Sequence, residues 1–508
     1  MKQAWWETRW FAATLIALSV VPMLYPGFPP LVDLPSHMGR YKIAMGDSSY
    51  LARYFDFRWQ LSGNLGADLL IVPLAWVAGP VAATKIVTIL IPPLIVAATL
   101  AIGKQAHGRL SPCAAMAVPL VYTLPFLYGF LNYMLAVALA LWVYYLFVRL
   151  GRAGRLKLRA ALMAPMALLL FITHISGWGI VGLIAFASEW VRLRETGQSA
   201  ARAASGSAIQ MLPLALPLLL LLAWQSEAVG TTKYWFDWKL KILWSATLFR
   251  DSWRVLDSLT LLVVYALMAI VLLARPFRID RSLGMGALAL FIAFAVLPFV
   301  IFGSSLSDIR LLPVPLMLLF AGVRPFEAGQ HRLAIGTATA VAAIVLSRMA
   351  LVTLSFAQAS DRQRQQLSVL GHVERGARVA VAVGGKCRFW PLPRSDHLGS
   401  MAIVRREAFA NDQWFLPGSV SLIVHYPLAG SYASDPSQFL PNDGCAPEDL
   451  AAWVQRLPAT AFDYMWLLET GPVAARLTTG WVLVAQGPDS RLYRKERPYR
   501  AGRLNTQP

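Results

Sequence analysis

Two side chains that can exchange protons, a carboxylate and an imidazole, stand four residues apart at Asp33 and His37. Pro35 lies between them, and proline favours the first turn of a helix. Residues four apart lie near the same face of a helix, so we expect both side chains near one face of that first turn. Asp33 follows a proline-rich turn, where helix capping would be its only evident structural task. We therefore expect Asp33 to be functional.

Other polar candidates stand where apolar stretches end. They are Asp56, Asn132, His174, Asp308 and Arg310. Charge within a membrane region indicates function by default. Each candidate also has a structural alternative. Asp56 could pair with Arg53 or Arg58, Asp308 could pair with Arg310, Asn132 could cap a helix, and His174 could be an ordinary hydrogen-bonding residue.

The elements that hold these side chains are predicted to cross a membrane. Hydrophobic residues make up 57% of the 508 residues and charged residues only 14%, which excludes a water-soluble protein. Apolar runs recur through the first 356 residues, many long enough to approach or cross a hydrocarbon core. No small-residue cleavage site follows the first run, so we expect a retained helix and not a secretory signal. The net charge of +19 reflects basic loops between spans and does not indicate nucleic-acid binding.

The hydropathy pattern predicts eleven crossings and a cytoplasmic N-terminus. The crossings are expected at 11–25, 84–103, 112–127, 132–149, 157–173, 177–193, 208–224, 258–275, 284–303, 309–323 and 332–355. Every short basic loop then falls on the cytoplasmic side. If the segment 66–80 also crossed, all later basic loops would fall on the outer side. We therefore expect this segment to lie in the outer interface or to be re-entrant. The long outer loops are then 26–83 and 225–257.

The C-terminal segment 357–508 differs from the rest and predicts a small α/β domain on the outer, periplasmic side. Strands are expected at 377–383, 419–425, 462–468 and 481–485, with a helix at 447–456. No nucleotide-binding glycine motif is present. Cys387 and Cys445 could form a disulfide outside the cytoplasm or remain two free thiols, whereas Cys113 lies in a hydrophobic segment.

Three short motifs resemble an uncharacterised bacterial group within the GT-C superfamily of integral membrane glycosyltransferases. They are Asp33-Leu34-Pro35-Ser36-His37, Gly129-Phe130-Leu131-Asn132-Tyr133 and Asp308-Ile309-Arg310-Leu311-Leu312-Pro313. The layout is also similar: a first span, a large outer loop with an early Asp, many further spans and an outer C-terminal domain.

The resemblance implies a polytopic α-helical protein of the inner (cytoplasmic) membrane that transfers sugar from a polyprenyl-phosphate-linked donor. The acceptor would be an envelope glycan, lipid or protein. The resemblance further implies that Asp33 is the catalytic base, with His37 and His174 orienting it or the acceptor. We expect inversion at the sugar carbon. Two other classes remain open, a transporter or flippase for lipid-linked glycans and a non-catalytic scaffold of a polysaccharide assembly complex.

Several residues near the outer interface are candidates for binding the substrates. They are Arg58, Asn132, Lys233, Lys239, Arg250, Arg254, Asp308 and Arg310. The cations among them could stabilise a lipid phosphate, or they could anchor the chain together with interleaved aromatic residues. We expect Arg310 to be the foremost phosphate ligand.

The sequence does not determine the cofactor. Asp33, Asp56 and Asp308 are scattered along the chain, which favours a reaction without a metal, while His37 and His174 leave a divalent transition metal open.

Overall fold

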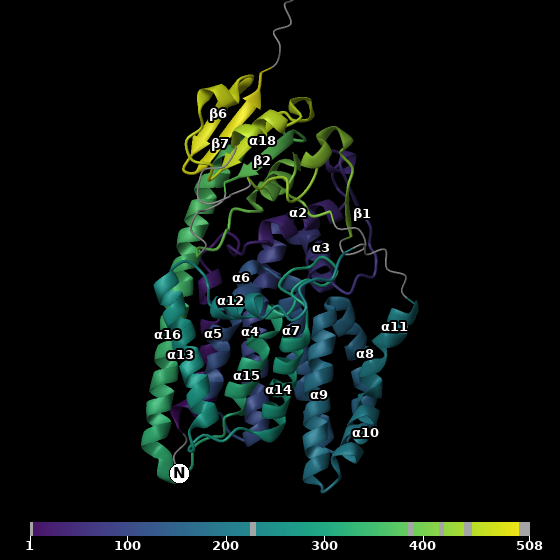
Figure 1. The fold of residues 1–508 in the computed structure, drawn as a ribbon, viewed down its shortest axis with the longest axis vertical. Helices are drawn as coiled ribbons and strands as arrows, with labels where there is room; N and C mark the ends of the chain where they lie inside the picture. The colour runs from purple at the N-terminus through teal and green to yellow at the C-terminus, as the bar shows by residue number, and fades with distance from the viewer. Residues whose placement is uncertain (1–3, 224–229, 385–389, 416–420, 441–449, 497–508) are drawn as a thin grey trace, which may run out of the picture.

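The structure is a computed structural model that describes residues 4–223, 230–384, 390–415, 421–440 and 450–496. It consists of a long helical bundle with a small α/β domain stacked on one end (Figure 1). The N-terminus lies at the opposite end of the bundle from this domain. One hydrophobic core runs from the bundle into the domain, so the two parts are packed together.

The first two thirds of the chain are helical. The helices are α1 (Arg9–Leu18), α2 (Leu34–Ala44), α3 (Gly66–Ala78), α4 (Pro80–His107), α5 (Ala117–Val121), α6 (Leu124–Tyr128), α7 (Leu131–Arg152), α8 (Leu156–Thr173), α9 (Ile175–Glu195), α10 (Ala200–Met211), α11 (Pro217–Ala223), α12 (Trp238–Ala246), α13 (Arg254–Leu273), α14 (Arg281–Val296), α15 (Pro313–Gly322) and α16 (His331–Gln366).

Five helices of the described part are long and apolar enough to cross a membrane. They are Pro80–His107, Leu131–Arg152, Leu156–Thr173, Arg254–Leu273 and His331–His372. The multi-pass membrane class is thereby supported, while the count of eleven stays a prediction. Several other expected crossings coincide with shorter apolar helices, which are Arg9–Met23, Pro112–Tyr128, Arg281–Val296 and Ile309–Gly322.

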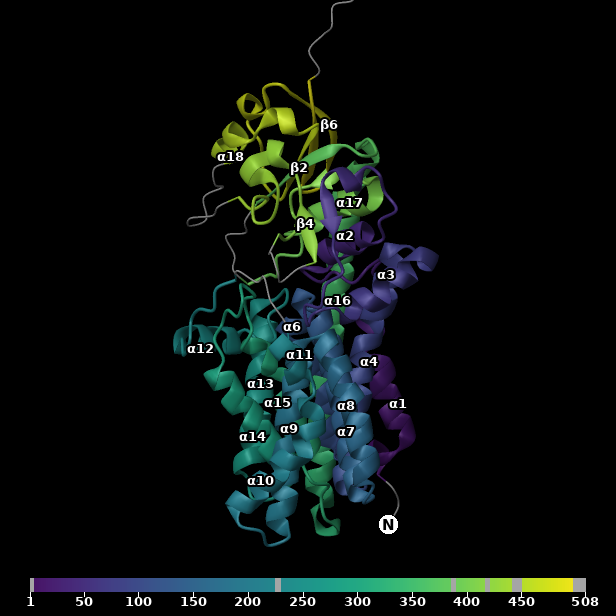
Figure 2. The same ribbon diagram turned by 90° about the vertical axis from the view of Figure 1, so that its right-hand side faces the viewer.

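The segment expected not to cross forms α3. This helix has 13 residues, and at about 1.5 Å per residue it spans roughly 20 Å, less than a hydrocarbon core of about 30 Å. It lies beside the upper end of α4, next to α2 (Figure 2). Gly79, with a φ of +80°, separates α3 from α4 and lets the chain change direction.

The C-terminal domain is built on a five-stranded sheet of order β3-β2-β5-β7-β6. The strands are β2 (Arg378–Val383), β3 (Phe409–Ala410), β5 (Tyr464–Leu468), β6 (Trp481–Gly487) and β7 (Ser490–Lys495), and the helices are α17 (Met401–Arg406) and α18 (Leu450–Arg456). β2 pairs in parallel with both β3 and β5, whereas β7 is antiparallel to β5 and β6. β2 and β5 are almost wholly buried, as expected for central parallel strands.

One expected strand belongs elsewhere. β4 (Leu422–Val424) does not join the domain's sheet but pairs with β1 (Phe55–Phe57) of the first outer loop. The pairing is antiparallel, with Asp56 opposite Ile423. This two-stranded ribbon ties the C-terminal domain to the first outer loop, which also contains Asp33. Cys387 and Cys445, by contrast, lie outside the described residues.

The longest helix connects the two parts. α16 has 36 residues, or about 54 Å, so it exceeds a hydrocarbon core of about 30 Å. It continues past residue 357, where the soluble domain was expected to begin, and its last turns stand beside the domain (Figure 1).

The placement of the termini gives a testable topology. Because the short basic loops and the N-terminus are expected in the cytoplasm, a reporter active only there should be silent when fused after Pro508. The same reporter on a protein truncated after Arg152 should be active. A strong signal from the fusion at Pro508 would contradict the predicted orientation.

Candidate active site

Asp33 stands where the first outer loop enters the bundle, directly before α2. Its N–H donates to the Tyr128 carbonyl over 2.8 Å, and the Val32 N–H donates to Leu127 over 3.2 Å, so this segment is tied to α6. Gly129 permits the close approach, because its φ is +92° and a Cβ there would lie 3.4 Å from the Asp33 nitrogen. The Asp33 carboxylate makes no capping hydrogen bond to α2. Helix capping therefore does not account for this residue.

His397 of the C-terminal domain faces Asp33. The distance from its Nε2 to Asp33 Oδ1 is 3.8 Å, which is longer than a hydrogen bond. Its Nδ1 lies 3.4 Å from the Asp412 carbonyl oxygen. That contact assigns the N–H to Nδ1, so the Nε2 lone pair points towards Asp33.

Trp414 packs against two imidazoles of this site. Its ring centroid lies 5.2 Å from that of His37 and 4.7 Å from that of His397, so the indole contacts one imidazole from each part of the protein. Phe439 adds a second aromatic ring 5.9 Å from His397. The Asp33 side chain is only 15% exposed.

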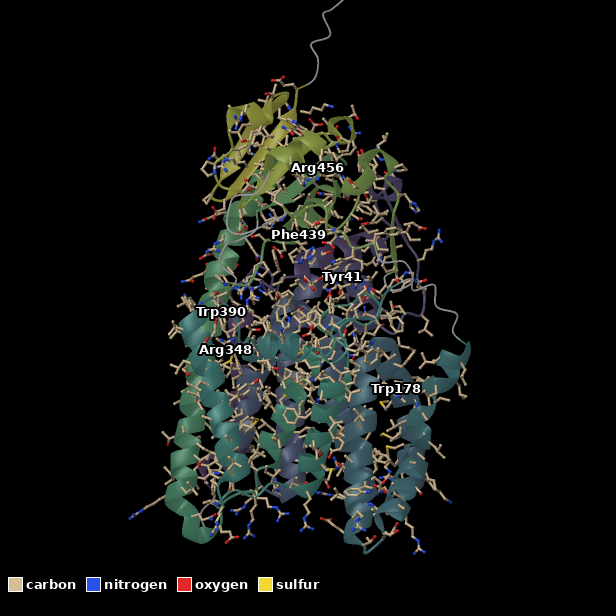
Figure 3. All side chains as sticks on the ribbon, in the orientation of Figure 1. Tyr41, Trp178, Arg348, Trp390, Phe439 and Arg456 are labelled. Carbon is tan, nitrogen blue, oxygen red and sulfur yellow. The ribbon has the colours of Figure 1, made fainter. Side chains whose placement is uncertain are left out.

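The sheet explains why these residues gather here. His397 lies in the connection that follows β2, and Asp412 and Trp414 follow β3. The carboxyl ends of parallel strands meet at one edge of a sheet, the usual place for binding groups in α/β domains. In this protein that edge is turned towards the bundle. Figure 3 shows the junction, with Phe439 of the domain above Tyr41 of α2.

Burial determines the protonation of the site. Removal from water raises the pKa of Asp33 to about 7. The charge of Arg310 lowers this pKa by a smaller amount, and the charge of Asp435 raises it further. Burial also raises the pKa of Asp412 to about 7. It lowers the pKa of His397 to about 4 and that of His37 well below its usual value. Near neutral pH the histidines are uncharged, and Asp33 is poised between its two states.

Arg310, the expected phosphate ligand, is brought to the Asp33 site. It lies in the single turn η6 (Ile309–Leu311), with its guanidinium 3.8 Å from the centre of the Phe130 ring. The guanidinium donates to Ser304 Oγ over 3.0 Å and to the Ser305 carbonyl over 2.7 Å. Its Nε is buried without a hydrogen-bond partner among the described residues.

The alternative in which Asp308 pairs with Arg310 is wrong. Asp308 instead accepts a hydrogen bond of 2.6 Å from Lys241 Nζ, and both side chains are almost fully buried. Lys241 also donates to the carbonyls of Phe294 and Leu297. Asp308 therefore serves to hold α12 against the loop before α15, and its predicted contact with substrate has no support in this arrangement.

The other expected cations are spread over the outer end of the bundle. Arg250 is buried and donates to the carbonyls of Trp390 and Pro391, which ties it to the C-terminal domain. Arg58 is exposed and bonds Asp56 over 2.8 Å, which confirms a local ion pair. Three cations are exposed on the surface, namely Lys233, Lys239 and Arg254. The structure does not bring these three to Asp33.

Asn132 is held by hydrogen bonds within the protein and does not cap α7. This helix begins at Leu131, its N-cap residue is Phe130, and no side chain caps it. Its Oδ1 accepts from the Ala67 N–H over 2.5 Å, and its Nδ2 donates to the Asn64 carbonyl and to Asp68. Asp68 also pairs with Arg40 over 2.8 Å, and both are buried. Asn132 thereby ties the start of α3 to α7, and the Asp68–Arg40 pair ties α3 to α2.

His174 lies at the junction of α8 and α9. Its Nδ1 accepts from the Ser176 N–H over 3.1 Å, so it caps α9. Its ring contacts Tyr133 edge to face, with centroids 5.6 Å apart, and Tyr133 donates to the Arg310 carbonyl over 2.5 Å. This confirms the alternative of a satisfied hydrogen-bonding residue and places His174 on the Arg310 side of the site.

The sequence interpretation missed His397, Asp412 and Trp414. The usable signal was that polar residues follow the predicted parallel strands, because the carboxyl ends of such strands carry binding groups. Within the part of the chain that the structure describes, no three His, Cys, Asp or Glu side chains are grouped as metal ligands. A reaction without a metal remains a prediction.

No family model and no curated protein matches the chain. Among solved structures it is similar to ArnT from Cupriavidus metallidurans, both in the apo state and bound to undecaprenyl phosphate. Each comparison has a TM-score of 0.50 and 11% identity, and it covers 95% of this chain and 97% of the ArnT chain. The chain therefore shares the fold of ArnT, and at this identity the likeness establishes the fold alone.

Proposed function

We propose that this protein transfers a sugar from a polyprenyl-phosphate-linked donor to an acceptor hydroxyl at the outer face of the membrane. The observation that carries the proposal is the enclosed Asp33 carboxylate, whose pKa of about 7 suits a base at neutral pH. The GT-C fold supports the reaction class, and the ArnT structure that holds undecaprenyl phosphate supports the donor class.

In the proposed reaction the acceptor oxygen attacks the anomeric carbon of the donor. Its proton passes to the Asp33 carboxylate as the new C–O bond forms. The bond from the anomeric carbon to the phosphate oxygen breaks, and its electron pair leaves with the polyprenyl phosphate. Attack opposite the leaving group inverts the anomeric configuration.

Arg310 supplies the positive charge for the departing phosphate. Its buried Nε has no protein partner among the described residues and is available as a donor. A fixed cation stabilises the transition state most where water is excluded. On the Asp33 side, His397 and Trp414 limit the entry of water.

The function is tested with the full-length protein in liposomes, supplied with polyprenyl-phosphate sugars and envelope extracts. Release of polyprenyl phosphate and a new glycosidic product, both followed by mass spectrometry, are the expected result. Movement of the intact donor across the bilayer without release would favour the flippase alternative instead.

Trp414 gives a prediction about pH. Because burial is the main reason for the raised pKa of Asp33, Trp414→Ala should admit water and lower that pKa. The acidic limb of the pH–rate profile should then move to lower pH, and turnover on the plateau should fall because the base is weaker. Phe415→Ala is the matched control, since Phe415 is the next residue and is exposed. An unmoved limb in Trp414→Ala would mean that this indole does not control the base.

A further inference from the structure

A pocket lined mainly by residues with polar side chains lies beside α16, apart from the Asp33 carboxylate. Its volume is about 440 Å³, which is within the range of roughly 300–1,000 Å³ that small-molecule sites occupy. One wall is a face of α16, where Gln358, Arg362 and Gln366 recur at intervals of four residues. The opposite wall contains Trp253, directly before α13, and the loop Pro391–Ser395.

Two observations indicate that the pocket is built to bind. Gln363 Oε1 and Arg394 Nε are buried in its lining without a hydrogen-bond partner among the described residues. Unpaired buried groups are costly and uncommon. Glu469 closes the pocket from the carboxyl end of β5, and its backbone has a φ of +54°, a strained conformation for a side chain of this kind.

The charges of the lining nearly cancel. Arg394 is neutralised by Asp251, at 2.5 Å. Arg362 and Glu469 contribute one positive and one negative charge. A phosphate would meet a carboxylate as well as a cation here, whereas a neutral ligand rich in hydroxyls would meet amides, serines and Trp253.

The position of the pocket relates it to the proposed chemistry. Trp390, next to the lining residue Pro391, donates to Asp257, which also accepts from Arg348 of α16, each over 2.8 Å. Figure 3 shows Arg348 and Trp390 close together. Ser395 lines the pocket, and His397, two residues further on, faces Asp33. Because successive Cα atoms are about 3.8 Å apart, the Cα atoms of Ser395 and His397 are at most about 7.6 Å apart.

From this geometry we infer that the pocket binds neutral sugar units of a glycan acceptor and so presents the next unit to Asp33. That the bound sugars belong to an acceptor rests on the proposed function, whereas the binding of neutral saccharide rests on the pocket alone. Gln and Ser side chains supply both donors and acceptors for sugar hydroxyls, and the indole supplies an apolar face.

The test uses the full-length protein in lipid nanodiscs and four neutral probes: maltotriose, cellotriose, chitotriose and mannotriose. Saturation-transfer NMR and calorimetry measure binding. At least one probe should bind the unaltered protein, and Gln358→Trp, which fills the pocket from an exposed position, should weaken that binding at least tenfold. Gln365→Trp, on an exposed residue of α16 outside the pocket lining, should bind as the unaltered protein does.

Each outcome bears on a different claim. The inference is overturned if no probe binds, if Gln358→Trp binds normally, or if inorganic phosphate displaces the saccharide. If the saccharide binds as expected but transfer never occurs with any donor, the pocket stands and the proposed function fails. If transfer occurs while Gln358→Trp leaves the acceptor KM unchanged, the function stands and the pocket inference fails.

Discussion

Asp33→Asn should reduce the rate of sugar transfer by about a hundred- to ten-thousand-fold, the usual contribution of a general base. The amide has nearly the same shape as the carboxylate but cannot take the hydroxyl proton. Donor binding should change much less, because the phosphate cation is left in place. Turnover and donor affinity are measured separately, with purified protein and a polyprenyl-phosphate sugar.

The pH–rate profile sharpens this prediction. Asp33 must be ionised to act as a base, so activity should rise with pH through about 7, following its pKa. The residual activity of Asp33→Asn should lack that limb. Asp56→Asn is the control, because Asp56 belongs to the same outer loop and is exposed in a pair with Arg58. Near-normal transfer by Asp33→Asn would defeat the assignment.

Asp33→Asn should be more stable than the unaltered protein at high pH. The pKa of Asp33 is raised from 3.8 to about 7 in the folded protein, so folding favours the protonated carboxyl. The contribution of Asp33 to the free energy of unfolding is therefore fully present below pH 4 and is lost as pH rises through about 7. At about 1.4 kcal/mol per pKa unit, ionisation costs up to ~4 kcal/mol. Asp33→Asn should therefore melt higher than the unaltered protein at pH 8 and at a similar temperature near pH 4. A lower melting temperature at pH 8 would contradict this account.

Local patterns carried much of the sequence prediction. Pro35 correctly indicated a helix start beside Asp33, because a ring-fixed φ suits the first turn and the missing N–H costs nothing there. The apolar runs at 377–383 and 462–468 correctly indicated strands, since buried parallel strands are continuous and rich in apolar residues. These signals depend on neighbours in the chain.

Contacts between distant segments could not be predicted in this way. His397 and Trp414 reach Asp33 only because the sheet edge is turned towards the bundle and the β1–β4 ribbon fixes it there. Sequence proximity also misled in one case. Asp308 and Arg310 are two residues apart at a single 3₁₀ turn, where successive side chains rotate by about 120°, so they point in different directions. Asp308 consequently meets Lys241 from α12.

Replacing Arg310 with Met should weaken binding of undecaprenyl phosphate by roughly 10- to 100-fold, since a hydrogen bond to a charged group contributes about 1.5–3 kcal/mol. Turnover should fall further, by about a hundred- to a thousand-fold in all, because the cation acts most strongly on the charge that develops as phosphate leaves. Met keeps the apolar contact with Phe130. Binding is measured with undecaprenyl phosphate in nanodiscs and turnover with the full donor.

A second readout separates this role from a structural one. Arg310 lowers the pKa of Asp33, so its loss should raise that pKa and move the acidic limb of the rate profile to higher pH, opposite to the shift expected for Trp414→Ala. Lys239→Met is the matched control, because Lys239 is an exposed cation of the same outer surface. If Arg310→Met binds undecaprenyl phosphate normally and the limb does not move, Arg310 serves only to hold the Ser304–Ser305 turn, and the phosphate must be bound by another cation at the outer end of the bundle.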